Sequence, residues 1–145
     1  MSKTTEDPLR KRPRRLWVAA VMNMVAGLIG LFMLAYLSTS PQVPDEFRPG
    51  PGAAVFSLAT ASLLIASSAL ALLGRARWDW LMLAAAVVYY GGILAQNIYI
   101  LIQVQETAIP TQPLVSHAVR SGLEIAINLW AVLSAKTRSY FSHAN

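Results

Sequence analysis

The segment Leu16–Leu37, LWVAAVMNMVAGLIGLFMLAYL, contains 22 residues and no charged side chain. A helix that rises 1.5 Å per residue needs about 20 apolar residues to cross roughly 30 Å of hydrocarbon. A cleaved signal peptide has an apolar core of only about 7–15 residues, so this segment is expected to remain as an anchor. The segment therefore predicts an α-helical integral membrane protein.

The composition favours the same class and excludes several others. Of the 145 residues, 55% are hydrophobic and 13% are charged, whereas soluble domains carry roughly 25% charged residues. The length leaves room for one domain. The chain has no cysteine, which excludes disulfides, thiolate metal sites and cysteine nucleophiles.

Three more apolar segments follow the first one. The connection after the first segment contains four prolines between residues 41 and 51, and it is expected to be an extended loop because proline has a fixed φ and no N–H. The expected spans are about 16–37, 53–73, 81–104 and 114–135. The predicted fold class is all-α: a four-helix transmembrane bundle formed by residues 16–135, with a basic arm at 1–15 and a tail at 136–145.

Lys and Arg residues are distributed unequally on the two sides of these spans. The arm, the loop at 75–77 and the tail together hold ten, whereas the two opposite loops hold only Arg48. By the positive-inside rule, both termini are expected on the cytoplasmic side, and we expect the membrane to be a prokaryotic inner membrane. The arm is expected to contact anionic lipids. It is too short for the folded platform of a nucleic-acid-binding domain, so no nucleic acid is expected as a partner.

The fourth expected span has a polar face. Five residues share this face because they recur at spacings of three and four: His117, Arg120, Ser121, Glu124 and Asn128. Glu124 lies ten residues after Leu114, about 15 Å along the helix and near the middle of a bilayer. A charge at that depth costs about 2.5–3.5 kcal/mol on insertion scales. Arg120, one turn before Glu124, is its expected partner.

Polar side chains of the other spans are expected at the same depths. Counted along antiparallel helices, two tyrosines and two amides of the third span fall level with Glu124 and Arg120, and an asparagine of the first span falls level with Asn128. The candidate intramembrane site therefore comprises Glu124, Arg120, His117, Asn128, Gln96, Asn97, Tyr89, Tyr90 and Asn23. Gly27 and Gly30 recur at helical spacing with Asn23 and predict a seam of close helix packing.

Two interpretations of this site remain open. In the first, Arg120 and Glu124 form a buried intrahelical pair that is capped by amide and tyrosine hydroxyl groups and fixes helix rotation. In the second, Glu124 binds a proton or a cationic ligand. A midplane carboxylate beside aromatic residues resembles small four-span multidrug transporters that exchange protons for cations as dimers. Those transporters carry their essential Glu in the first span, whereas this chain has Asn23 and no acid there, and Arg120 would repel a cation.

Catalysis has little support in the sequence. His117 and His143 are the only histidines, and no His or acid spacing matches a metal site. Ser116, His117 and Ser121 do not form a triad by spacing, and there is no glycine-rich phosphate loop. No cofactor is expected, and no motif assigns a family.

These observations predict a small membrane accessory or interaction protein that forms a homo-oligomer or joins a larger membrane assembly. The alternative is a minimal proton- or ligand-coupled transporter that uses Glu124. A lipid-directed membrane enzyme is a distant third, because so little aqueous surface would suit no other substrate class.

Overall fold

The computed structural model describes residues 13–45, 48–74, 77–103 and 112–142, in which all the regular secondary structure is helical. The helices are α1 (Arg14–Thr39), α2 (Pro51–Leu72), α3 (Trp78–Gln103), α4 (Gln112–Leu133) and α5 (Ala135–Ser142). The prediction of an all-α chain is confirmed. Each expected span coincides with one of the first four helices, with ends that differ by at most three residues. Most of the basic arm, Arg75, Val104 and His143 lie outside the described residues.

Helices α1, α2 and α3 are each long and apolar enough to cross a membrane. Helix α4 joins this set only together with α5, from which it is separated by a bend of 58°. Helix α4 differs from the other three long helices because Arg120 and Glu124 on its polar face lower its mean hydropathy. The described part of the chain therefore holds three helices able to span a membrane, or four if α4 and α5 form one bent span.

Helix α5 occupies a segment for which the sequence predicts only a short tail. Its first turn is anchored on the carbonyl of Ser134, which accepts the N–H groups of Thr137 and Arg138 at 3.0 Å. Thr137 and Phe141, one turn apart, are buried, whereas Lys136 and Arg138 are exposed. The helix is amphipathic, but two turns are too short for a clear apolar period in the sequence.

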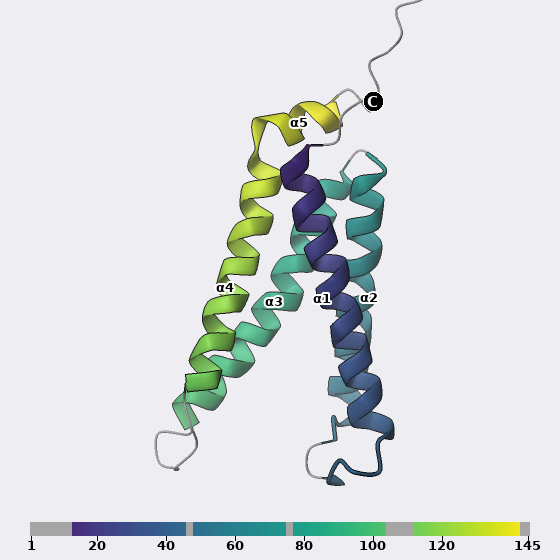
Figure 1. Ribbon diagram of the computed structural model, residues 1–145, viewed down its shortest axis with the longest axis vertical. Helices are drawn as coiled ribbons and strands as arrows, with labels where there is room; N and C mark the ends of the chain where they lie inside the picture. The colour runs from purple at the N-terminus through teal and green to yellow at the C-terminus, as the bar shows by residue number, and fades with distance from the viewer. Residues whose placement is uncertain (1–12, 46–47, 75–76, 104–111, 143–145) are drawn as a thin grey trace, which may run out of the picture.

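The long helices form two hairpins, α1 with α2 and α3 with α4, which are joined by packing of α2 on α3. Helices α1 and α4 approach each other near α5 and diverge toward the other end (Figure 1). We call the end at which α1 begins and α4 ends the closed end. The opposite end, at which α1 ends and α4 begins, is the open end.

A continuous apolar core fills the closed end. It comprises Leu16, Ala19, Ala20, Ala71, Met82, Leu83, Ala131, Val132 and Phe141. Four of these nine residues are alanine, and small side chains allow membrane helices to pack closely. Phe141 brings α5 into this core, so α5 lies across the closed end of the bundle (Figure 1).

Gly27 lies in the seam between α1 and α2. A Cβ atom on Gly27 would come within 2.6 Å of Ile65 Cγ1 and 3.2 Å of the Ala61 carbonyl oxygen. Glycine therefore permits a contact that no other residue could make without a shift. The predicted seam is confirmed at this position.

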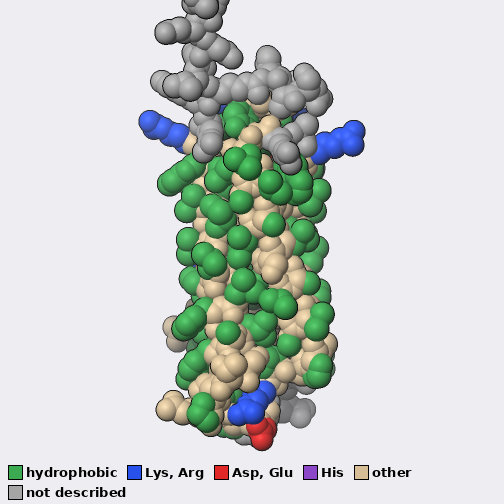
Figure 2. Space-filling view, turned by 90° about the vertical axis from the view of Figure 1, so that its right-hand side faces the viewer, with side chains coloured by type: hydrophobic (Ala, Val, Ile, Leu, Met, Phe, Trp, Pro, Cys, Tyr) green, Lys and Arg blue, Asp and Glu red, His purple; other side chains and the backbone are tan. Residues whose placement is uncertain are grey.

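The sides of the molecule are largely apolar. Figure 2 shows hydrophobic side chains along the height of one face, with charged side chains at its two ends. Large exposed hydrophobic residues on the four long helices include Phe32, Val55, Ile102 and Leu123. Such a surface suits hydrocarbon rather than water as its surroundings.

Candidate functional site

A pair of asparagine side chains joins α1 to α4 at the edge of the closed end. The Asn23 amide donates to Asn128 Oδ1 at 2.7 Å, and the Asn128 amide donates to Asn23 Oδ1 at 3.0 Å. Both side chains are completely buried. The sequence predicted only that Asn23 and Asn128 lie at the same depth in the membrane, and the structure brings them into direct contact.

Two further hydrogen bonds complete this amide pair. Asn128 Nδ2 also donates to the Glu124 carbonyl oxygen at 2.8 Å, and the Tyr90 hydroxyl donates to Asn23 Oδ1 at 3.1 Å. Asn128 thereby uses both of its N–H groups, so its carbonyl oxygen must face Asn23. The network fixes the relative rotation of α1, α3 and α4, and mutual satisfaction of its polar groups makes their burial tolerable.

The expected ion pair is present one turn from this network. Arg120 Nε lies 3.0 Å from Glu124 Oε1. The expectation that both partners are buried is wrong, because the Glu124 side chain is 13% exposed while that of Arg120 is 69% exposed. Its exposure shows that no helix of the described chain covers Arg120.

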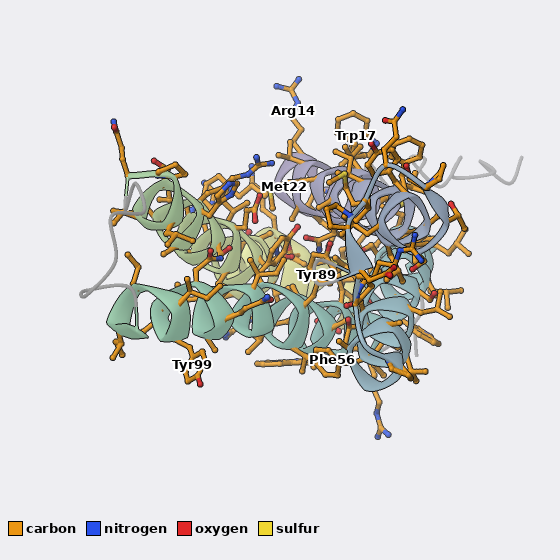
Figure 3. The ribbon with its side chains drawn as sticks, turned by 90° about the horizontal axis from the view of Figure 1, so that it is seen from below. Arg14, Trp17, Met22, Phe56, Tyr89 and Tyr99 are labelled. Atoms are coloured by element: carbon orange, nitrogen blue, oxygen red, sulfur yellow. The ribbon has the colours of Figure 1, made fainter. Side chains whose placement is uncertain are left out.

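The expected capping of this ion pair by tyrosine hydroxyls differs from the contacts in the structure. The Tyr89 hydroxyl donates to the Ala26 carbonyl of α1 at 3.2 Å, and the Tyr90 hydroxyl is bonded to Asn23. The two rings meet edge to face, with centroids 5.2 Å apart. The tyrosines thus link α3 to α1, and their side chains are turned toward the interior between the hairpins, where Figure 3 shows Tyr89.

A cavity of about 180 Å³ lies between these tyrosines and the polar face of α4. Four predicted site residues line it besides Tyr89: Tyr90, His117, Arg120 and Glu124. Ser121, which is buried, and Gly30 also line it. Gly30 lies directly against the Tyr89 hydroxyl group, so a Cβ atom at this position would displace that hydroxyl.

The two remaining predicted residues lie elsewhere. The Asn97 amide donates to the Ile93 carbonyl of its own helix at 2.8 Å. Gln96 is exposed and lines a different cavity. The expectation that these amides cap the ion pair is wrong, because Asn97 is bonded within its own helix and Gln96 borders a cavity that α4 does not line.

That second cavity, of about 420 Å³, was not anticipated from the sequence. Its walls come from α1, α2 and α3 and include Met33, Phe56 and Ile93. Tyr89 and Gly30 border both cavities. Apolar residues dominate its lining, and in a sequence such residues are indistinguishable from lipid-facing ones.

Arg15 makes a further contact that the sequence did not reveal. Its guanidinium carbon lies 4.1 Å from the centroid of the Trp130 ring. Arg15 belongs to α1 and Trp130 to α4, so this cation–π contact joins the two helices near the closed end.

The chemistry open to the site is binding and ion pairing. Within the described residues, no group of three or more His, Cys, Asp or Glu side chains could hold a metal ion. Comparison of the chain with protein-family models, with curated proteins and with solved structures gives no match. The argument for function therefore depends on the geometry of the site.

Proposed function

We propose that this chain is a small accessory protein of a prokaryotic inner membrane, which it crosses four times with both termini in the cytoplasm. Its polar α4 face receives a transmembrane helix of a partner, either a larger membrane assembly or a second copy of the chain. The distribution of charge supports the orientation, because Arg14, Arg15, Lys136 and Arg138 belong to the closed end. A complementary role for the basic arm is contact with anionic lipids.

The exposure of Arg120 carries this proposal. Arg120 lies eight residues into α4, about 12 Å from its first residue, and hydrocarbon around an uncovered guanidinium is costly. A long side chain at that depth can usually reach toward the nearer membrane surface. Arg120 instead pairs with Glu124, one turn deeper, and it remains 69% exposed in this single chain. A partner helix over α4 would shield the pair.

The shape of the open end supports the same role. The Asn23–Asn128 pair joins α1 to α4, and the two helices diverge toward the open end (Figure 1). The polar face of α4 is therefore accessible from the side. His117 extends this face toward the open end and is exposed. Its ring nitrogens can bond to polar atoms of a neighbouring helix.

Photo-crosslinking in native membranes tests the proposal. A benzophenone amino acid placed at His117 on the polar face is expected to capture a polypeptide, whereas the same probe at Val115 or Val119 on the opposite face is expected to capture mainly lipid. The mass of the adduct distinguishes a second copy from a larger partner. Equal capture from both faces, or none from either, would contradict the proposal.

The charge pair supplies a matched test of specificity. Arg120→Ala is expected to abolish capture at position 117, because an unpaired Glu124 would be left in the interface. Val119→Ala, on the exposed face of the same helix, is the control and is expected to leave capture unchanged. Restoration of capture by the double change Arg120→Ala and Glu124→Ala would assign the pair a structural role instead.

The second candidate function is transport that uses Glu124. The observation that favours it is the 180 Å³ cavity bordered by Glu124 and two tyrosines. Proteoliposomes would show this activity as pH-dependent flux that Glu124→Gln abolishes without loss of folding. Flux of that kind, together with unchanged partner capture in the variant, would replace the accessory function.

A further inference from the structure

The larger cavity lies apart from the polar face of α4, and its position along the helices is well defined. It extends from Pro49 and Ala53 at the open end to Thr60 and Tyr89 in the middle of the bundle. Ala53 and Thr60 are seven residues apart on α2, which corresponds to about 10 Å. One leaflet of a bilayer contributes about 15 Å of hydrocarbon, half of the total thickness. The cavity thus runs along most of one leaflet.

The inner part of this cavity offers apolar contacts. The Thr60 hydroxyl is bonded to the Phe56 carbonyl of its own helix at 2.8 Å, and the Tyr89 hydroxyl is bonded to Ala26 at 3.2 Å. Their donors are therefore already used. Met33, Phe56 and Ile93 supply hydrophobic surface. Such a lining favours an apolar occupant, since a polar one would lose its hydration without gaining equivalent hydrogen bonds.

Polar character increases toward the open end. Gln96 lies one helical turn beyond Gly92, is exposed and borders the cavity. Arg48 of the neighbouring loop is paired with Asp45 at 3.1 Å. The site is therefore amphiphilic along its length, apolar in the middle of the bundle and polar at its mouth.

The depth of the cavity distinguishes between possible occupants. Its lining runs about 10 Å along the helices and ends at Tyr89 in the middle of the bundle. A transmembrane helix crosses both leaflets, whereas an acyl chain of a phospholipid stays within one leaflet. The cavity therefore matches a single acyl chain rather than a helix from another chain.

We propose that this cavity binds one acyl chain of a phospholipid from the leaflet at the open end, with the headgroup at the level of Gln96 and the chain terminus near Tyr89. Met33 and Phe56 are large exposed hydrophobic residues of the cavity wall, so the chain enters sideways from the bilayer. Because Arg48 is already paired with Asp45, the site binds zwitterionic and anionic phospholipids alike.

Two phenylalanines provide an internal comparison for the test. Phe56 lines the cavity, whereas Phe32 does not and lies on the exposed surface of α1. The full chain is placed in phosphatidylcholine–phosphatidylglycerol vesicles that contain a small fraction of phosphatidylcholine with a diazirine near the end of one acyl chain. After illumination, mass spectrometry compares lipid adducts on the two residues. Phe56 is expected to be labelled severalfold more than Phe32, although it is the less exposed of the two.

Adjacent glycines provide a matched pair of variants. A Cβ on Gly92 would lie 3.6 Å from Phe56 Cε1, whereas a Cβ on Gly91 would meet nothing within 4 Å. Gly92→Leu therefore fills the cavity, and the adduct on Phe56 is expected to fall by about fivefold or more, which corresponds to roughly 1 kcal/mol of binding free energy. Gly91→Leu is expected to leave it unchanged. Ser57→Leu fills the cavity from α2 and is expected to cause the same loss of the adduct. It replaces Gly92→Leu as the test if that variant does not fold.

Two results would overturn the proposal. One is equal labelling of Phe56 and Phe32 in the original chain, which would show that Phe56 meets only bulk lipid. The other is retention of the Phe56 adduct in folded variants whose cavity is filled. Replacement of the labelled phosphatidylcholine by the corresponding phosphatidylglycerol tests the lack of headgroup preference. A severalfold difference in the yield of the Phe56 adduct would refute equal binding of the two lipids.

Discussion

The closed and open ends of the molecule are built from the same four helices and differ in how their interior is filled. At the closed end, alanines alternate with Leu16, Met82 and Val132 to form a continuous core. At the open end, two cavities lie on either side of Tyr89 and Gly30. Dense packing therefore provides stability at one end, while the other end retains surface for a ligand or partner.

The Asn23–Asn128 pair marks the boundary between these two regions. Both amides are fully buried and mutually bonded. The Arg120–Glu124 pair lies one to two turns further toward the open end, and there Arg120 is exposed. The difference teaches that the polar groups within this bundle are of two kinds: the amides join α1 to α4, whereas the charge pair lies within one helix and leaves Arg120 exposed, as the proposed partner contact requires.

The largest effect on stability is expected at the core of the closed end. Phe141→Ala removes the buried aromatic side chain that attaches α5 to the core, and the free energy of unfolding should fall by about 3 kcal/mol. Phe32→Ala, on the exposed surface of α1, is the matched control and should change it little. Unfolding in mixed micelles measures both variants. Equal effects would show that the closed end is not better packed than the lipid-facing surface.

The boundary between the two ends is expected to contribute the next largest effect. Asn128→Leu leaves the buried amide of Asn23 without its partner, which should lower the free energy of unfolding by about 1–3 kcal/mol. The control is Asn97→Leu. Because the Asn97 amide is bonded within its own helix, this change should lower the free energy of unfolding by less.

A double-mutant cycle sharpens this test of the boundary. Asn23→Leu combined with Asn128→Leu should cost less than the sum of the single changes, because the second change removes an amide that the first had already left unsatisfied. The same unfolding assay reports the coupling. Strict additivity would contradict a direct amide pair.

Glycine substitutions compare a close helix contact with an open position by means of a single methyl group. Gly27→Ala places a methyl group against Ile65 and the Ala61 carbonyl and should destabilise the protein by about 1–2 kcal/mol. Gly91→Ala meets open space and should stabilise it by up to about 1 kcal/mol, because alanine restricts the unfolded chain. Thermal unfolding of the two variants should shift in opposite directions, and shifts of the same sign would argue against the seam.

The smallest of these effects is expected for the contact between Arg15 and Trp130. Arg15→Ala removes a cation–π interaction with a ring at 4.1 Å and should reduce the free energy of unfolding by about 0.5–1 kcal/mol. Arg14→Ala removes an exposed neighbouring charge and serves as the control. If both substitutions lower the free energy of unfolding equally, Arg15 contributes only through its charge and not through its contact with the Trp130 ring.

The helices were predictable because long apolar segments separated by prolines leave few other ways to divide the chain into elements. Leu16–Leu37 predicted most of α1, and the level of Asn23 with Asn128 followed from the rise of antiparallel helices. The Arg120–Glu124 pair was predictable from its spacing of four residues within one helix. These features depend on local geometry, which a sequence specifies directly.

The remaining features depend on how the hairpins diverge. Gln96 and Asn97 were expected to cap the ion pair because equal depth was taken to mean contact, but Asn97 is bonded within its own helix and Gln96 borders a cavity that α4 does not line. The larger cavity was missed because Met33 and Phe56 resemble lipid-facing residues. Helix α5 was missed because its apolar face consists of about two turns.

Two spin-label distances test most directly whether the molecule is closed at one end and open at the other. The chain has no cysteine, so labels can be attached at Val18 with Leu133, near the closed end, and at Tyr36 with Val115, near the open end. All four side chains are exposed, and both pairs join α1 to α4. Pulsed electron resonance in lipid nanodiscs should give a clearly longer distance for Tyr36–Val115 than for Val18–Leu133. Equal distances for the two pairs would contradict the divergence of the hairpins and the account of the site that depends on it.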